Sequence, residues 1–335
     1  MKKVIYISYA VCAIAMFALL FYMFDHLRVI ESNTREDNEY TQLQPYRTWV
    51  VKDSGAPIGV SKVFQFKVPA IGKGTKTLAF YSHHQDVVIY KGDKVIYQRR
   101  VYQGNPFGRT SGQGWNDLTL YSEDSGKILT VVMSPEYSTV QGIDVTFYYG
   151  SKIKIWLHDV IRQLAPSILS LIAIVMGMIF VVFILVNIRN KKINRNLLFM
   201  GIFSICIGVW KITDAGILQL LFGNNILFSY IPFVSLLLCV IPFVLFMRTL
   251  FTDRESKGWY IVCLASLAVM VFSFVVQILN KGDMRETLPF NHAVMGVMAL
   301  VTVVQVVRQW KKQGMNRKLK LIFCCFLTCI VGLIG

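Results

Sequence analysis

Apolar residues along this chain fall into seven long runs, with one extended polar stretch between the first run and the second. A helix that crosses a membrane needs about 20 consecutive, predominantly apolar residues, and each run is close to that length. The runs are Val4–Phe24, Leu164–Asn187, Leu197–Ile217, Ile226–Met247, Trp259–Leu279, Leu288–Val307 and Leu319–Gly335. The pattern predicts a transmembrane anchor over residues 1–24 and a six-helix transmembrane region over residues 160–335.

The polar stretch has a different period. Between residues 45 and 159, short runs rich in Val, Ile, Tyr and Phe alternate apolar with polar positions, and Gly, Pro, Asn or Asp separate most of them. These runs are Val63–Val68, Thr77–Tyr81, Asp86–Tyr90, Lys94–Gln98, Asp117–Tyr121, Ile128–Met133 and Asp144–Tyr149. Short strands without intervening helical periods predict an antiparallel β-sandwich, jelly-roll-like in architecture. Residues 25–44, which are charged and lack a clear period, are expected to be a stalk or linker.

Composition supports a membrane protein. The chain has 335 residues, is 54% hydrophobic and has a net charge of +16, with a mean hydropathy of +0.50. A long disordered chain is excluded because such chains are poor in apolar residues. A nucleic-acid-binding protein would explain the charge but not the hydropathy. All seven cysteines lie in apolar runs, so we expect neither a disulfide framework nor a cysteine metal site.

The charge also predicts an orientation. If the N-terminus is cytoplasmic, the inner loops and termini carry a net charge of +13, whereas residues 25–162 carry only +3. Cytoplasmic loops are typically enriched in Lys and Arg, so the β-domain is expected outside the plasma membrane. Seven spans that start inside would end outside, and Gly335 would then leave a carboxylate at or near the membrane. We therefore expect a truncated sequence or a domain set cut from a longer protein.

One loop of the outer domain is a candidate ligand site. Residues Gln103–Gly114 read QGNPFGRTSGQG, and Trp115 follows directly. Arg109 offers a charge and Trp115 an aromatic surface, as binding loops on β-sandwiches often do, and Tyr90 completes the candidate set. The alternative is a solvated connection whose tryptophan caps the core. His83 and His84 are adjacent on a predicted strand and point to opposite faces, so we predict no metal site there.

Three polar residues within or beside the spans are signalling candidates. Lys211 and Asp214 are three residues apart on one helix, so they share a face and are able to pair near the outer interface. His292 enters a span from the same side, where it would respond to external pH. Ionisable residues at membrane depth are functional candidates by default. The alternative for Lys211 and Asp214 is that they simply extend to the lipid headgroups and pair there.

Four segments of the outer domain resemble a known family: FYSHHQDVVIYKGDKVIYQ, FGRTSGQGWNDLTL, GKILTVVMSPEY and IDVTFYYGSK. They are similar to the outer sandwich of bacterial seven-transmembrane receptors with diverse intracellular signalling modules, and more narrowly to the sensor half of membrane-bound GGDEF-type proteins. Trp210–Asp214 and Ile241-Pro242 are similar to patterns in the helices of that family. The resemblance covers nearly all of residues 45–335, but the family has seven helices after the outer domain and this chain has six.

The resemblance implies a receptor whose output enzyme lies beyond Gly335, commonly a diguanylate cyclase and sometimes a histidine kinase. Such a receptor would bind an extracellular small molecule, carbohydrate or protein, would dimerise through its output domain and would not bind nucleic acid. No Gly-Gly-Asp/Glu-Glu-Phe string and no phosphate-binding glycine-rich loop occurs here, so we expect no catalysis and no cofactor from these residues. A transporter or channel with an accessory sandwich, and a membrane enzyme such as an acyltransferase or protease, are the alternatives. A transporter usually has midplane charges and internal repeats, which are absent here, and an enzyme would have only Lys211, Asp214 and His292 as polar candidates.

Overall fold

The computed structural model describes residues 40–72, 74–101, 109–187, 196–222, 225–251 and 257–314. The predicted anchor over residues 1–24 and the predicted span Leu319–Gly335 lie outside these ranges. The chain divides into two compact units. The β unit comprises Met1–Val101, Thr110–Ile168 and Ala215–Ile226, and the helical unit comprises Tyr102–Arg109, Leu169–Asp214 and Leu227–Gly335.

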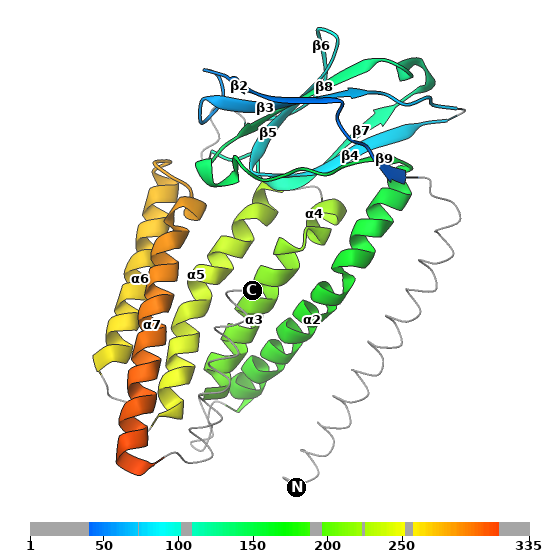
Figure 1. Cartoon of the computed structure of the whole chain (residues 1–335). Helices are drawn as coiled ribbons and strands as arrows, with labels where there is room; N and C mark the ends of the chain where they lie inside the picture. The colour runs from blue at the N-terminus through cyan, green and yellow to red at the C-terminus, as the bar shows by residue number, and fades with distance from the viewer. Residues whose placement is uncertain are drawn as a thin grey trace. The chain divides into compact units, whose positions relative to one another are not determined.

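The strands of the β unit form two antiparallel sheets (Figure 1). The four-stranded sheet has the order β1-β9-β4-β7, and the five-stranded sheet has the order β2-β3-β8-β5-β6. The strands are β1 (Tyr40–Gln42), β2 (Arg47–Lys52), β3 (Val60–Lys67), β4 (Lys76–His83), β5 (Gln85–Lys91), β6 (Lys94–Arg99), β7 (Gln113–Leu120), β8 (Ile128–Pro135) and β9 (Phe147–Gly150). Strands that are neighbours in a sheet, such as β1 and β9 or β3 and β8, are far apart in the sequence, so long connections join them.

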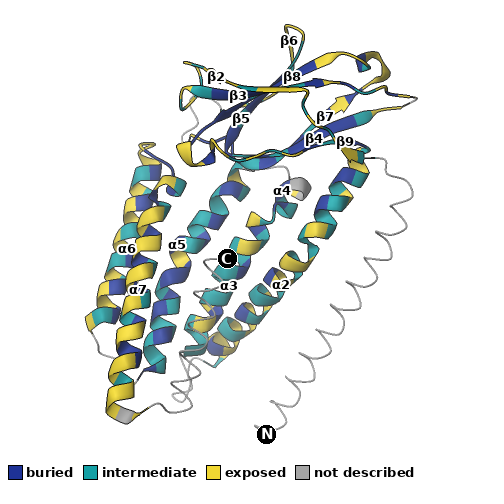
Figure 2. Cartoon of the chain, viewed as in Figure 1, coloured by how far each residue is buried: buried dark blue, intermediate teal, exposed yellow. Residues whose placement is uncertain are grey.

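The two sheets share one hydrophobic core. Phe147 of β9 contacts Phe80 of β4 within its own sheet, and it contacts Phe64 and Phe66 of β3 in the other sheet, with ring centroids 4.6–5.0 Å apart. Dark blue, buried residues accordingly recur along the strands of both sheets (Figure 2), and many of them form one core cluster. The antiparallel sheets and the sandwich core predicted from alternating positions are confirmed.

Two strands were not predicted from the pattern. β1 lies inside the segment expected to be a stalk, and three residues are too few to display a period. In β2, only Trp49 is even half-buried and the other five residues are exposed. As the edge strand of its sheet, β2 therefore shows no alternation of apolar and polar positions. The seven predicted runs correspond to β3 through β9, with ends that differ by a few residues.

The helices are α2 (Lys152–Val186), α3 (Asn196–Asp214), α4 (Ile217–Phe222), α5 (Asn225–Leu250), α6 (Lys257–Ile278) and α7 (Met284–Gln313). Among the described residues, all of these except the short α4 are long and apolar enough to cross a membrane. Leu264 of α6 and Leu300 of α7 are more than two-thirds exposed, and yellow, exposed residues recur along both helices in Figure 2. Apolar surface of this kind is compatible with contact to lipid.

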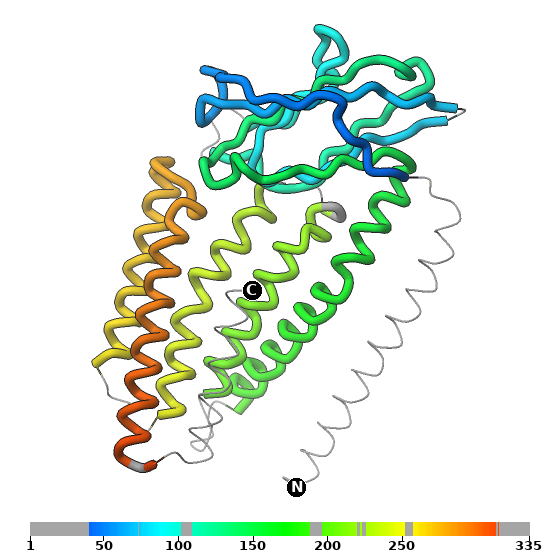
Figure 3. Tube along the Cα trace, viewed as in Figure 1, coloured from blue at the N-terminus to red at the C-terminus, as the bar shows by residue number. Residues whose placement is uncertain are grey.

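Close packing of helices in the helical unit depends on glycine. A Cβ atom at Gly177 of α2 would lie 2.6 Å from the carbonyl oxygen of Gly201 in α3, so only a residue without a side chain fits. The tube in Figure 3 traces α6 and α7 as neighbouring helices of one hairpin. Among the described residues, Cys206, Cys239 and Cys263 are free thiols.

Candidate functional site

The start of α2 is bonded to strand β7 by a group that we call the β7–α2 contact. It comprises Trp115 and Asp117 of β7 with Lys152, Trp156 and Asp159 of α2. The indole nitrogen of Trp115 donates to Asp159 Oδ2 at 2.9 Å, and that of Trp156 donates to Asp117 Oδ2 at 3.1 Å. Lys152 Nζ forms an ion pair with the same Asp117 oxygen at 3.3 Å.

Local geometry explains why these residues meet. Side chains alternate across a strand, so Trp115 and Asp117 point to one face of β7 while Asn116 between them is fully buried on the other. On α2, Lys152, Trp156 and Asp159 follow one another at spacings of four and three residues and therefore share a helix face. The Trp115–Asp159 and Trp156–Asp117 hydrogen bonds therefore join one face of β7 to one face of α2.

Aromatic rings extend this contact. The Trp115 ring packs against Tyr81 of β4 and Tyr148 of β9, with centroids 5.9 Å away in each case. On the same side, the His158 ring of α2 lies 5.4 Å from that of Tyr40 in β1. Ligand binding by Trp115 remains a prediction. The structure adds that its indole N–H already has a carboxylate partner, which agrees with the alternative of a structural tryptophan.

The short helix α4 also belongs to the β unit. Gln219 accepts a hydrogen bond from the Tyr81 hydroxyl at 3.2 Å. Gly216, just before α4, has a φ of 78° and lies against the Tyr81 ring, where a Cβ would meet Cε2 at 3.4 Å. A residue that adopts positive φ without strain is needed at this turn.

Arg109 is held within the helical unit by the α6–α7 turn. Its backbone N–H donates to both carboxylate oxygens of Asp283 at 3.2 Å, and its guanidinium donates to the Lys281 carbonyl. Asp283 is the N-cap of α7, is 1% exposed, and also accepts hydrogen bonds from Tyr230 and Gln277 at 3.0 and 3.1 Å. Arg109 is therefore a well-bonded residue, and its role in ligand binding stays a prediction.

Of the other predicted residues, Tyr90 belongs to the β unit, as Trp115 does, and Lys211, Asp214 and His292 belong to the helical unit. Tyr90 is half-buried in β5 of the five-stranded sheet, next to a bulge between Ile89 and Tyr90. Lys211 is exposed, with its Nζ 4.3 Å from the centre of the Trp210 ring. Asp214 is the last residue of α3, and no ion pair joins it to Lys211 in the described structure. His292 is exposed on α7. Within the β unit, Tyr90 and Trp115 belong to different sheets.

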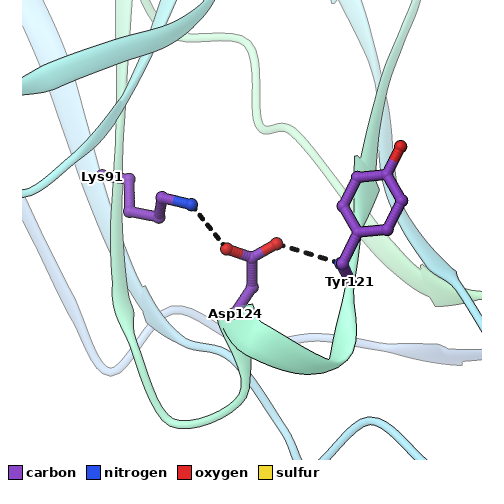
Figure 4. Close-up of polar contacts among 3 residues, drawn as sticks. All are labelled: Lys91, Tyr121 and Asp124. Carbon is purple, nitrogen blue, oxygen red and sulfur yellow. Dashed lines mark hydrogen bonds and ion pairs between the residues drawn. The ribbon is translucent and has the colours of Figure 1, made fainter. Parts of the chain in front are cut away.

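A separate ion pair stabilises the turn after β7. Lys91 Nζ lies 2.6 Å from Asp124 Oδ1, and Asp124 Oδ2 accepts the backbone N–H of Tyr121 at 2.9 Å (Figure 4). Burial alone would raise the pKa of the Asp124 carboxyl. The hydrogen bonds from Lys91 and Tyr121 outweigh that effect and hold the pKa below its ordinary value. This arrangement fits a structural support for the turn.

Sequence reasoning missed Asp117, Trp156, Asp159 and Asp283. The first apolar run after the β-domain starts at Leu164, whereas α2 begins at Lys152, separated from the end of β9 by one residue. Trp156 and Asp159 were therefore treated as part of the outer domain. The spacing of four and three residues between Lys152, Trp156 and Asp159 is the sequence signal that a helix already begins here. For Asp283, the signal was Glu286 three residues later, which forms a capping box with it.

Comparison with known proteins adds no assignment. No family model matches this chain, and no curated protein matches it. The residue-level contacts described above are accordingly the basis for a functional proposal.

Proposed function

We propose that this chain is the sensor module of a transmembrane signal receptor. In this proposal, the two sheets form an extracellular, jelly-roll-like domain that detects a small molecule, a carbohydrate or a protein partner. The helices cross the plasma membrane and pass a shift to a cytoplasmic output domain, which we expect to be a diguanylate cyclase and, as the alternative, a histidine kinase. The receptor is expected to act as a homodimer through that output domain.

The β7–α2 contact is the observation that carries the proposal. α2 is one continuous helix of 35 residues, of which the first part, through Ile168, belongs to the β unit and the remainder belongs to the helical unit. Two indole-to-carboxylate hydrogen bonds and one ion pair hold its first turns to β7. A rearrangement of β7 would therefore move the start of a helix that continues into the helical unit.

Physical reasoning supports a switch of this kind. A ligand changes an equilibrium between two states only when it binds them with different affinity. Hydrogen-bonded, half-buried contacts have discrete arrangements, so a small shift at β7 would be transmitted as a displacement of α2 rather than absorbed locally. The net charge of +13 on the proposed inner side favours the orientation with the β unit outside.

Two measurements test the proposal. The reading frame downstream of Gly335 should encode an output domain, and cells that carry the whole gene should change their cyclic diguanylate level when Trp115 is replaced by Phe. Trp49→Phe, on the exposed edge strand β2, is the matched control and should leave the level unchanged. A gene without an output domain, together with solute flux through proteoliposomes of the purified chain, would overturn the receptor proposal in favour of a transporter.

A further inference from the structure

Two carboxyl groups meet at one end of the five-stranded sheet, away from the β7–α2 contact. Asp86 belongs to β5, and Glu136 directly follows β8. Asp86 pairs in register with Ser134, so Asp86, Ser134 and Glu136 point to the same face of the sheet. Glu136 is therefore the diagonal neighbour of Asp86 across the β5–β8 pair, and the two carboxyl groups interact. Glu136 is only 8% exposed, so water does not solvate its charge.

The hydrogen bonds leave one oxygen without a donor. Glu136 Oε1 accepts both the backbone N–H and the hydroxyl of Ser111, each at 2.6 Å. Asp86 Oδ1 accepts the backbone N–H of Val101 at 3.2 Å. Glu136 Oε2 is buried and has no hydrogen-bond partner among the described residues. A buried acceptor without a donor costs free energy, so a missing donor is expected at this oxygen.

No ion pair among the described residues joins either carboxyl group to a cation. The half-buried guanidinium of Arg99 acts on both carboxyl groups through its charge, but its hydrogen bonds go to neutral acceptors, the carbonyls of Gly112, Ser111 and Gly114 and the side chain of Asn116. The remaining charged or titratable groups around the pair are Arg100, Tyr81, Tyr97, His84 and Tyr137.

Each of these neighbours has another role or a remote position, and the Tyr81 hydroxyl donates to Gln219. Arg100 is exposed and influences Asp86 only through its charge. His84 Nδ1 lies 2.8 Å from the Thr110 hydroxyl, and its ring packs on Tyr137. Tyr97 donates its hydroxyl to Asn116. None of these contacts supplies a donor to Glu136 Oε2.

We propose that Asp86 and Glu136 form a proton-binding site, in which a single shared proton is the ligand. The carboxylates of buried Glu136 and half-buried Asp86 repel each other, and without a direct ion pair they do not both remain charged. One proton between them removes one negative charge and provides the donor that Glu136 Oε2 lacks. The site would respond to the pH around the β unit.

The titration of the pair agrees with this geometry. Burial raises the pKa of the Glu136 carboxyl to about 7, against the donors of Ser111 and Thr110, which lower it. Burial also raises the pKa of Asp86 above its ordinary value. The two groups interact, so the proton belongs to the pair rather than to one residue. The site would therefore change its charge near neutral pH.

Proton binding would be linked to the folding of the surrounding segments. The unfolded chain releases the Glu136 proton near the ordinary pKa of 4.5, whereas the folded unit retains it to about 7. The folded state consequently binds more protons in this interval. The stabilisation is complete below pH 4.5 and is lost as the pH rises through 7. Segment Thr110–Gly112, whose Ser111 bonds Glu136 directly, should open more easily when the proton leaves.

Hydrogen–deuterium exchange of the whole chain in lipid nanodiscs tests this inference. The exchange of residues 110–113 is measured at pH 5 and pH 8 and corrected for the intrinsic pH dependence of amide exchange. We expect the opening equilibrium to rise by about 10- to 100-fold between the two pH values in the wild type. In Glu136→Gln, whose amide mimics the protonated acid, the rise should fall below about threefold. Proton binding is tested here by itself, so the outcome does not depend on the chain being a receptor.

Two further variants make the result decisive. Asp86→Asn should also abolish the pH dependence, and it replaces Glu136→Gln if that variant does not fold. His84→Asn should retain the full dependence, and Asn tolerates the positive φ of 51° at this position. A wild type with less than about threefold dependence, or carboxyl variants that keep the wild-type dependence, would overturn the proposal. Loss of the dependence in His84→Asn alone would assign the proton to the histidine instead.

Discussion

Replacement of Trp115 by Phe should loosen the start of α2 from the β unit. Phe keeps an aromatic ring against Tyr81 and Tyr148 but removes the indole N–H that donates to Asp159. Asp159 is 8% exposed, so its carboxylate would lose a donor that water does not readily replace. A hydrogen bond to a charged group contributes about 1.5–3 kcal/mol. A loss of about 2 kcal/mol corresponds to a roughly 30-fold increase in the local opening equilibrium.

Hydrogen–deuterium exchange of the full chain in nanodiscs measures this change directly. Peptides that cover β7 and residues 152–159 should exchange about 10- to 100-fold faster in Trp115→Phe than in the wild type. Trp49→Phe is the matched control, because Trp49 lies on the edge strand β2 and its ring has a cation–π contact with Arg47. Asp159→Asn retains an acceptor oxygen and should have a smaller effect than Trp115→Phe.

Unchanged exchange in Trp115→Phe would refute the reasoning. In that case, the Trp115–Asp159 hydrogen bond would not hold α2 to the sheet, and the proposed route from β7 into the helices would lose its main support. Faster exchange throughout the β unit would have a different meaning, since it would indicate global destabilisation rather than local release of α2. The comparison of β7 with the distant strand β3 separates these outcomes.

Three further predictions concern packing, capping and pH. Gly177→Val should destabilise the chain by about 1–3 kcal/mol because the side chain overpacks α2 against α3. Gly296→Ala should not, since no atom lies within 4 Å of its Cβ. Thermal unfolding in micelles distinguishes the two variants. Asp283→Ala should lower the unfolding temperature, since removal of an N-cap costs about 0.5–2 kcal/mol. The donors of Arg109, Tyr230 and Gln277 would also lose their acceptor. Asp283→Asn, which keeps an acceptor oxygen, is the control. The stabilisation from Lys91 and Asp124 should be present above pH 3.8 and decline below it, and Asp124→Asn should remove this acid dependence from the unfolding curve.

Local patterns were sufficient for the strands that are buried on one side and for the helices that are apolar along much of their length. Strands β3 to β9 alternate because one face packs on the core around Phe147, and the long helices consist of continuous apolar runs. The edge strand β2 escaped detection because exposure on both faces removes the alternation. The start of α2 escaped detection because its first turns contact β7 and are therefore polar as well as apolar.

The sequence by itself determined the order of a β domain and apolar helices, as well as the asymmetric distribution of charge, because period and composition are properties of neighbouring residues. Only the tertiary structure decided the partners of the polar side chains. Trp115 and Asp159 are 44 residues apart, Arg109 and Asp283 are 174 apart, and Ser111 and Glu136 are 25 apart. Which donor meets which carboxylate depends on strand order and helix packing, and no local pattern encodes these contacts. Candidate residues can therefore be chosen from sequence by their chemistry, but their roles follow from the groups that the fold places beside them.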